Sequence, residues 1–282
     1  MTILLTGGTG KTSLRLASLL HSASIPVLLT SRRGTSTTSF PCVTFDWNDK
    51  TTWANPFTAA TDIKAVYLLS GNLHDPAPIL NSFIDLCKSK GVKRFVVCSG
   101  SSCEKGGPFH GKIWQKLEDE GLEFCVLRPS WFMENLSEPG HGHFETILHH
   151  NKIFTASGDG KIPWVSAEDI AAVAFHALTD DKSHDCAYRI LGPDLLSYDE
   201  IAETLSKQLG KQIVHVKLTE RQRVQGMMDA GVPEEMAKFL TNLEVMAREG
   251  RETWQGDDVE VVTGKKAISF DEFVVLNEGA WK

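Results

Sequence analysis

Glycine residues near the start of the chain have the spacing of a loop that binds phosphate groups. An apolar run, TILLT, leads into Gly7, Gly8 and Gly10, and a helical pattern follows them. Glycine lets the backbone turn sharply and approach a pyrophosphate, whose charge then lies at the N–H groups of the helix. Ser13 stands where a third glycine is usual, so we expect a slightly wider loop that keeps its phosphate contacts. The predicted diphosphate contacts are Gly7, Thr9, Gly10, Lys11 and Thr12, with a solvated helix position as the alternative for Lys11.

The second apolar run ends in arginines rather than in a carboxylate. Residues 1–45 contain no Asp or Glu, whereas NAD-binding folds place an acidic residue about 20 positions beyond the loop to bind the ribose 2′-hydroxyl. Ser31, Arg32 and Arg33 occupy that place here, and guanidinium groups bind phosphate through paired hydrogen bonds. The sequence therefore favours NADPH, unless both arginines are simply solvated turn residues.

Later apolar runs end in residues that are typical of a cofactor crevice. In parallel sheets of this type, ligands bind at the carboxyl ends of the strands. Asp46 and Trp47 end the third run and are expected beside the adenine, although packing in the core fits Trp47 equally well. The fourth and fifth runs add Ser70, Gly71 and Ser99 to the predicted rim.

The catalytic dyad of an ordinary ketone-reducing dehydrogenase is missing. Such an enzyme needs a Tyr to protonate the alkoxide and a Lys four positions later, and none of the three tyrosines, Tyr67, Tyr188 and Tyr198, has that lysine. Reduction of an iminium does not require this acid, because the cationic nitrogen already activates the carbon. The sequence thus fits either such a reduction or dinucleotide binding without turnover.

The order of the elements predicts the fold. Short apolar runs alternate with helical periodicities, which is typical of an α/β protein with a Rossmann-type, doubly wound parallel sheet. The rhythm changes beyond Pro129, where a segment rich in aromatic residues and histidines precedes further helices. We expect residues 1–135 to form an NADP(H)-binding core, and residues 136–282 to supply the remaining sheet elements and a smaller substrate-binding lobe.

Composition narrows the choice of partners and compartment. The 282 residues are 41% hydrophobic and 23% charged, with a formal net charge of −7, which is ordinary for a globular protein and unfavourable for nucleic acid or an anionic membrane. Neither a targeting segment nor an apolar run of about 18 residues is evident, so we expect a cytoplasmic protein with a small-molecule substrate. Six cysteines without a C-x-x-C pair are expected to be reduced thiols.

Several motifs together resemble a known family. TGGTGKT, FDW, GVKRFVVCSGSS, VLRPSWFMEN, GDGKIPWVSAEDIAAVAF and ILGPDLLSYDEIAE are similar to the NmrA-like branch of atypical short-chain dehydrogenases, and within it to fungal ergot-alkaloid enzymes. The resemblance extends from residue 1 to about residue 215 and weakens in the helical tail. It implies NADPH-dependent reduction of a cyclic iminium in an indole alkaloid pathway. An upstream oxidase is a candidate partner, and a monomer or a homodimer fits equally.

The resemblance also implies roles for residues near the reacting atoms. Pro129 and Trp131 would lie beside the nicotinamide, and Ser99 near the position of the usual catalytic serine. Lys105 and His110 fall where the missing dyad would lie, so we expect them to orient substrate or relay a proton, with a surface role as the alternative.

The predicted substrate contacts are mostly aromatic. Trp114 and Trp164 would stack on an indole-like ring, and Glu134 would balance the charge of an iminium. Packing in the core is the alternative for the residues of the WFM run. The full set of predicted substrate contacts is Ser101, Trp114, Trp131, Phe132, Met133, Glu134 and Trp164.

Two further alternatives concern the histidines and the overall function. His141, His143, His149 and His150 invite a metal site, but they lack the spacing of helical metal ligands, so a loop covering the substrate is favoured. The reduction could also be coupled to a cyclisation or cycloaddition. The competing class is a non-catalytic, dinucleotide-sensing regulator like NmrA itself.

Overall fold

The chain folds into two units that interleave along the sequence. The computed structural model describes residues 1–71, 73–140 and 142–282. Unit 1 consists of Met1–Pro129, Ala167–Ile190 and Asp258–Lys265, and unit 2 of Ser130–Ser166, Leu191–Asp257 and Lys266–Lys282. The sequence suggested one division at residue 135, whereas the chain passes from one unit to the other after residues 129, 166, 190, 257 and 265.

Unit 1 is built on a parallel sheet of seven strands in the order β3-β2-β1-β4-β5-β6-β9. The strand order changes direction between β1 and β4, and ligands of doubly wound folds bind at such a switch point. The predicted Rossmann-type fold is therefore confirmed. The strands are β1 (Thr2–Leu5), β2 (Val27–Ser31), β3 (Cys42–Thr44), β4 (Ile63–Leu69), β5 (Arg94–Cys98), β6 (Glu123–Leu127) and β9 (Cys186–Tyr188).

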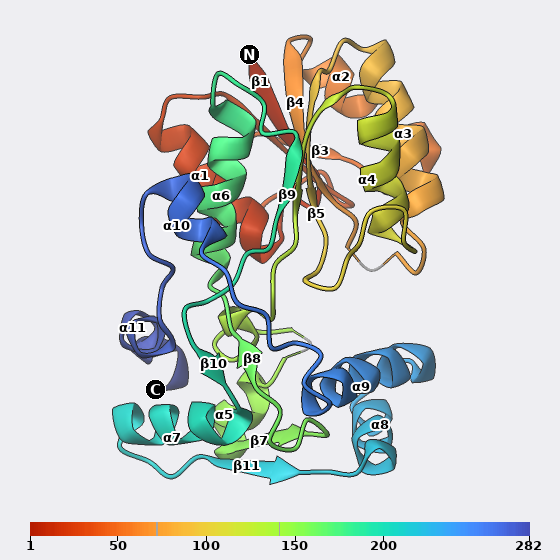
Figure 1. Cartoon of the computed structure of the whole chain (residues 1–282). Helices are drawn as coiled ribbons and strands as arrows, with labels where there is room; N and C mark the ends of the chain where they lie inside the picture. Colours follow the sequence, from red (N-terminus) through yellow and green to blue (C-terminus); the bar gives the residue numbers. More distant parts are fainter. Residues whose placement is uncertain (72, 141) are drawn as a thin grey trace. The chain divides into compact units, whose positions relative to one another are not determined.

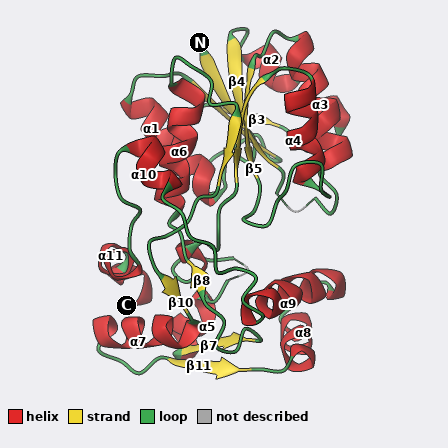
Figure 2. Ribbon diagram, in the orientation of Figure 1, coloured by secondary structure: helices red, strands yellow, loops and turns green. Residues whose placement is uncertain are grey.

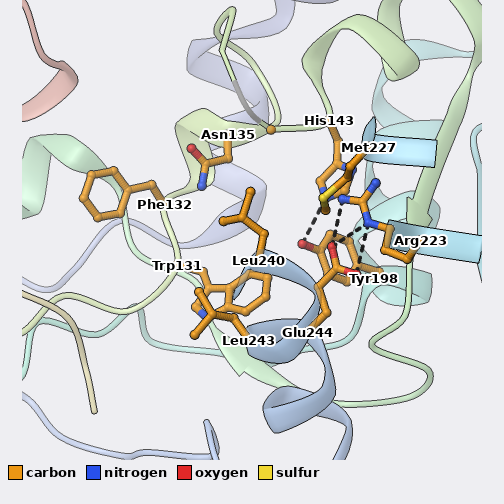
Figure 3. Close-up of a pocket in the computed structure, with 11 residues that line it drawn as sticks. Trp131, Phe132, Asn135, His143, Tyr198, Arg223, Met227, Leu240, Leu243 and Glu244 are labelled. Carbon is orange, nitrogen blue, oxygen red and sulfur yellow. Dashed lines mark hydrogen bonds and ion pairs between the residues drawn. The ribbon is translucent and has the colours of Figure 1, made fainter. Parts of the chain in front are cut away.

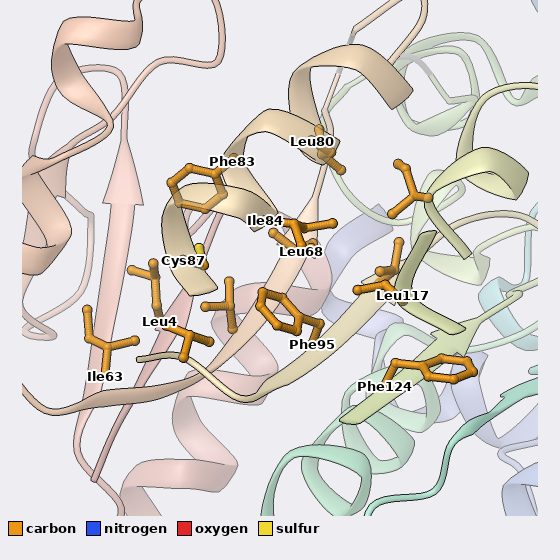
Figure 4. Close-up of a cluster of buried hydrophobic side chains, with 14 of the residues drawn as sticks. Leu4, Ile63, Leu68, Leu80, Phe83, Ile84, Cys87, Phe95, Leu117 and Phe124 are labelled. Atoms are coloured by element: carbon orange, nitrogen blue, oxygen red, sulfur yellow. The ribbon is translucent and has the colours of Figure 1, made fainter. Parts of the chain in front are cut away.

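Helices cover both faces of this sheet (Figure 1). On one side lie α1 (Lys11–Ser22), α6 (Ala167–Thr179) and α10 (Asp258–Thr263), and on the other α2 (Asn55–Ala59), α3 (Ala77–Ser89) and α4 (His110–Asp119); η1 (Lys50–Thr52) precedes α2. Figure 4 shows the core under α3 and α4, where Leu80, Phe83 and Ile84 pack over strand residues such as Phe95. Because both faces are covered, the buried positions of the central strands are mostly apolar.

Unit 2 contains two small sheets and several helices (Figure 2). Its core is aromatic and includes Trp164, Tyr198, Phe270 and Phe273. Ser197 forms a capping box with Glu200 at the start of α7. The elements are η2 (Met133–Asn135), α5 (Phe144–His150), β7 (Lys152–Thr155), β8 (Ile162–Pro163), β10 (Leu195–Leu196), α7 (Tyr198–Leu209), β11 (Val214–Lys217), α8 (Glu220–Asp229), α9 (Glu234–Arg248), α11 (Phe270–Leu276) and η3 (Glu278–Trp281).

The small sheets pair β7 with β11 in parallel and β8 with β10 antiparallel. Across the described ranges, none of the helices combines the length and the apolarity that a membrane span needs.

Candidate functional site

The glycine loop fits tightly between the ends of two strands. Gly8 donates its N–H to the Thr30 carbonyl at 2.8 Å, and a Cβ at Gly8 would lie 2.7 Å from the Leu29 Cβ. Gly7 has a φ of +60° and lies against Leu69, so a side chain there would meet both backbone strain and a clash. The glycines of the motif are therefore required by the close approach of the loop to β2 and β4.

The helix that follows the loop presents an uncapped amino end. Gly10 is the N-cap of α1, no side chain caps the first turn, and this turn contains no acidic residue. The amides of a first turn and the helix dipole together favour an anion. The geometry of Gly7, Gly10 and α1 thus fits a diphosphate, as the loop pattern predicts.

Ser13 occupies the third glycine position without leaving a polar group unsatisfied. Its side chain is fully buried, and its hydroxyl donates to the Thr6 carbonyl at 3.2 Å. Nearby, the Thr12 hydroxyl accepts a hydrogen bond from the Tyr67 hydroxyl at 3.0 Å. Serine is therefore accommodated between α1 and β1 by a hydrogen bond that glycine could not make.

Arg32 and Arg33 lie in the turn after β2, with exposed side chains. Neither forms a hydrogen bond or an ion pair with any residue in the described ranges. Ser31, in contrast, uses its hydroxyl to close the loop, donating to the Thr35 carbonyl at 2.7 Å and accepting from the Thr35 N–H at 3.1 Å. The two guanidinium groups are available to an anionic ligand, whereas the Ser31 side chain is already engaged.

Trp47 contributes mainly to the core. Its indole N–H donates to the Leu69 carbonyl at 3.1 Å, and its ring packs edge-on against Phe45 and Phe83. The Asp46 carboxylate accepts from the Asn48 N–H at 2.9 Å, which shapes the turn. These contacts support the packing alternative for Trp47.

His110 and Ser70 meet at the carboxyl end of β4. His110 is the first residue of α4, and its Nε2 lies 3.0 Å from the Ser70 Oγ. Burial lowers the pKa of His110 to about 4, although the Asp75 carboxylate acts in the opposite direction. The imidazole is therefore neutral at pH 7, so it can exchange a hydrogen bond with Ser70 without adding charge. Gly71 follows with a φ of +60° and an exposed position.

Ser99 and Lys105 have different surroundings. The Ser99 hydroxyl donates to the Leu127 carbonyl at 2.8 Å, which ties the ends of β5 and β6 together. The Lys105 ammonium lies 3.1 Å from the Glu118 carboxylate in an exposed ion pair. This placement supports the surface role that the sequence left open for Lys105.

Trp114 and Ser101 surround Arg128 in unit 1. The Arg128 guanidinium donates to the Ser101 carbonyl at 3.1 Å, pairs with Glu104 at 2.5 Å, and lies 5.8 Å from the centre of the Trp114 ring. Trp114 also packs against the sheet core, so it does not support the predicted stacking on a substrate. Pro129, the next residue, is buried.

Unit 2 contains a cavity of about 190 Å³ next to η2. Among the predicted substrate contacts, the half-buried Trp131 and Phe132 line it. Figure 3 shows their rings with the polar side chains of the cavity, among which the sequence had placed only His143 near the substrate. The remaining lining residues are Asn135, Gly142, His143, Tyr198, Arg223, Met227, Leu240, Leu243 and Glu244.

Met133, Glu134 and Trp164 lie in the interior of unit 2 instead. Met133 and Trp164 are each 1% exposed and belong to its core. Glu134 is fully buried and accepts a hydrogen bond from the Ser166 hydroxyl at 2.9 Å. The prediction of a counter-charge to an iminium is therefore corrected, because a fully buried, hydrogen-bonded carboxylate does not reach a ligand in the cavity.

The polar wall of the cavity is internally paired. Arg223 and Glu244 form a two-pronged ion pair, with nitrogen–oxygen distances of 2.8 and 2.9 Å, and Glu244 also accepts from the Ala156 N–H at 2.7 Å. The His143 Nε2 lies 3.2 Å from the Tyr198 hydroxyl. Burial lowers the pKa of His143 to about 3, and the charge of Arg223 adds to this effect, while burial raises the pKa of Glu244. The wall is thus net neutral and can take part in hydrogen bonding.

The sequence of α9 contains a feature that could have predicted the ion pair of this wall. The buried positions of that helix are Ala237, Thr241, Glu244 and Ala247, so Glu244 interrupts a stripe of otherwise uncharged residues. A carboxylate on a buried helical face demands a partner. Arg223, on the neighbouring α8, supplies it.

The histidines of the segment after Pro129 differ in their exposure to solvent. His141 lies outside the described residues, His143 is buried, and His149 and His150 are exposed in α5. Among the residues that the structure describes, no cluster of His, Cys, Asp or Glu could hold a metal ion.

Comparison with known proteins gives the family. The NmrA-like family matches residues 1–274, nearly the whole length. The chain belongs to the NmrA-like family. The resemblance expected from the sequence motifs is therefore confirmed, and it extends through the helical tail.

Similar proteins align with the entire chain. Agroclavine dehydrogenase of Claviceps fusiformis is 41% identical over 285 residues, which are 100% of this chain and 99% of that protein. Festuclavine synthase II of Penicillium roqueforti is 41% identical over 288 residues and covers 100% of both. The expected similarity to fungal ergot-alkaloid enzymes is thereby confirmed.

A solved structure shares the fold. Triphenylmethane reductase of Citrobacter sp., complexed with NADP(H), has a TM-score of 0.78 and 18% identity, covering 98% of this chain and all of that one. At this identity the likeness concerns the fold alone.

Proposed function

We propose that this protein is an NADPH-dependent reductase that transfers hydride to an imine or iminium intermediate of an ergot-type indole alkaloid. The observation that carries the proposal is the full-length similarity, at 41% identity, to agroclavine dehydrogenase and festuclavine synthase. The absence of a Tyr-x-x-x-Lys dyad from the sequence favours a carbon–nitrogen acceptor over a ketone, because an iminium carbon needs no general acid.

Unit 1 has the features that NADPH requires, and we assign it the cofactor. Gly7, Gly10 and the amino end of α1 would hold the diphosphate, and Arg32 and Arg33 the 2′-phosphate. NADPH, when bound, supplies the hydride. The chain's contribution is to hold and orient the reactants and to exclude water.

His110 and Ser70 are proposed as positioning residues at the carboxyl end of β4. Their hydrogen bond of 3.0 Å fixes a polar group at the edge of the sheet where ligands of this fold bind. Because burial keeps His110 uncharged at pH 7, it would not repel a cationic substrate. We expect His110→Phe, which removes the hydrogen bond, to lower kcat more than it raises KM for NADPH. A change in KM alone would assign His110 to cofactor binding.

We propose Trp131 and Phe132 as substrate contacts. Both line the cavity of unit 2, and both side chains are only half-buried. Aromatic rings attract both flat ring systems and organic cations, and both features occur in an indole-derived iminium. Unit 2 is accordingly proposed as the substrate-binding part.

NADPH oxidation by the purified protein tests this function. The panel consists of indole-derived iminium ions and their parent amino aldehydes, with products identified by mass spectrometry. Turnover with a gain of two hydrogen atoms supports a reductase, and a new ring in the product supports reduction coupled to cyclisation. Tight NADPH binding without turnover on the whole panel contradicts the proposal and favours a dinucleotide-sensing regulator.

A further inference from the structure

Two cysteines lie directly opposite each other at one edge of the unit 1 sheet. β9 is the last strand in the order and pairs in parallel with β6, so that Cys186 faces Cys125 in the register. Neighbouring strands are about 4.8 Å apart, and residues at the same level of a parallel pair point to the same face. Disulfides span Cα separations of about 4.4–6.8 Å, so the two side chains are within bonding range.

This arrangement distinguishes the pair from the other cysteines. In the described strand pairings, Cys42 opposes Leu29, and Cys98 opposes Leu69 and Leu127. Cys87 is buried in α3, and Cys103 lies in the loop after β5. Only one register in the described strands therefore brings two thiols together.

The two thiols differ in access to solvent. Cys125 is 1% exposed, whereas Cys186 is half-buried on the three-residue edge strand. An oxidant can thus reach Cys186, while Cys125 is shielded from solvent and faces its partner. This is the division expected between a thiol that reacts first and a thiol that resolves the product.

The surroundings favour a thiolate at Cys186. A hydrogen bond from the Cys125 thiol, with smaller contributions from the Tyr188 hydroxyl and from His184, lowers the pKa of Cys186 below the ordinary value of a thiol. Burial and the Asp258 carboxylate act in the opposite direction. The same interaction, together with burial, raises the pKa of Cys125. At neutral pH the nucleophilic form is therefore concentrated on the accessible cysteine.

We propose that Cys125 and Cys186 form a redox-active thiol pair that hydrogen peroxide converts into a disulfide. The Cys186 thiolate attacks a peroxide oxygen, so that a sulfur–oxygen bond forms, the oxygen–oxygen bond breaks, and the leaving hydroxide takes a proton to give water. The Cys125 sulfur then attacks the Cys186 sulfur. The sulfur–sulfur bond forms, and hydroxide leaves with the Cys125 proton as a second water. Two thiols are oxidised and one hydrogen peroxide is reduced.

The disulfide would join β9 to β6 at the edge of the sheet. Just beyond the pair, the Arg128 N–H donates to the Tyr188 carbonyl and the Ile190 N–H to the Arg128 carbonyl. Arg128 and Arg189 both donate to the carbonyl of Ser101, in the loop after β5. Oxidation would thus act on the strands that hold this loop in place.

Peroxide treatment of the full-length protein, followed by alkylation and non-reducing peptide mapping, tests the proposal. We expect a Cys125–Cys186 linked peptide and a loss of two hydrogen atoms from the intact mass. Cys186→Ser is expected to abolish the link, and Cys125→Ser to leave a sulfenic acid on Cys186 that dimedone traps. Cys42→Ser is the matched control, since Cys42 is half-buried on the opposite edge strand, and it should form the link as the unmodified chain does.

Alkylation kinetics of the unmodified chain keep the test independent of whether the variants fold. Cys186 should react with iodoacetamide at least about tenfold faster than Cys42 at pH 7, because its thiolate fraction is higher. Equal rates overturn the proposal, and so does oxidation of Cys186 that stops at sulfenic acid in the unmodified chain.

Discussion

The glycine loop of unit 1 and the cavity of unit 2 satisfy their polar groups in opposite ways. In the loop, backbone carbonyls take the hydrogen bonds of Gly8 and Ser13, and Arg32 and Arg33 extend into solvent. In the cavity, the polar side chains pair with each other, Arg223 with Glu244 and His143 with Tyr198.

This difference separates a surface with positive potential, which suits an anion, from a wall with little net charge. Unpaired guanidinium groups and an uncapped helix leave positive potential at the loop. A closed ion pair and an uncharged histidine leave little net charge in the cavity. Arg32 and Arg33 can be changed with little loss of stability, whereas the buried Arg223–Glu244 pair cannot.

The largest expected effect is therefore in the cavity. Glu244→Ala leaves the Arg223 guanidinium buried without its carboxylate, so the free energy of unfolding should fall by about 3–5 kcal/mol. Urea denaturation measures this change. Glu220→Ala is the matched control, since its pair with Arg248 is exposed and its loss should cost about 1 kcal/mol or less. Equal losses would show that the Arg223–Glu244 pair is not effectively buried.

The pH dependence of stability should be steep on the acidic side. Burial lowers the pKa of His110 to about 4 and of His143 to about 3, whereas an unfolded histidine titrates near 6.5. The unfolded chain binds more protons between these values, so stability falls as the pH drops below about 6.5, by up to about 1.4 kcal/mol per pH unit for each histidine.

Thermal or urea unfolding at several pH values tests this dependence. His143→Gln should remove the contribution of the cavity. His149→Gln is the control, because its side chain is exposed, and it should leave the slope unchanged. A slope that survives both His110 and His143 substitutions would assign it to other groups.

At the loop, the expected effect is on ligand affinity. Arg32→Ala combined with Arg33→Ala should weaken NADPH binding by at least about tenfold, since each charge-assisted hydrogen bond that is lost contributes roughly 1.5–3 kcal/mol. NADH binding and the unfolding midpoint should change little. Fluorescence titration with both dinucleotides measures this selectivity, with the exposed Arg221→Ala as control. Equal weakening for both dinucleotides would refute the 2′-phosphate assignment.

The smallest effect is expected at Lys105. Because its ion pair with Glu118 is exposed, Lys105→Ala should change stability by about 0.5 kcal/mol or less and leave kcat within about twofold, well under 1 kcal/mol of barrier. Steady-state kinetics with the substrate found in the panel checks this. A large loss of kcat would restore the catalytic role that the sequence suggested.

The sequence predicted unit 1 well because its signals are local. The glycines, the apolar strand runs and the arginines after β2 lie within a few positions of one another, and local patterns specify loops and strands directly. Trp164 was misinterpreted because an aromatic side chain suits a core as well as a ligand. Its burial and the hydrogen bond from its indole N–H to the Leu196 carbonyl place it in the core, whereas the role of the half-buried Trp114 beside Arg128 stays a prediction.

The cavity of unit 2 could not be predicted in the same way. Asn135, His143, Tyr198, Arg223 and Glu244 come from separate segments, and no periodicity joins them. Their convergence is a property of tertiary packing, which overrides local preference. The opposition of Cys125 and Cys186 likewise depends on strand order and register, since about 60 residues separate the two.

The late position of β9 has a consequence for how the protein is made. The residues of β9 leave the ribosome only after the segment 130–166, which belongs to unit 2. Until then, the edge of β6 that pairs with β9 has no partner strand. Such long-range pairing is slow and exposes unpaired strand edges during synthesis. A nascent chain ending near residue 135 lacks β9, α6 and α10, and its sheet edge at β6 is open to other chains. Early translational arrest should therefore yield a chaperone client rather than a working cofactor domain.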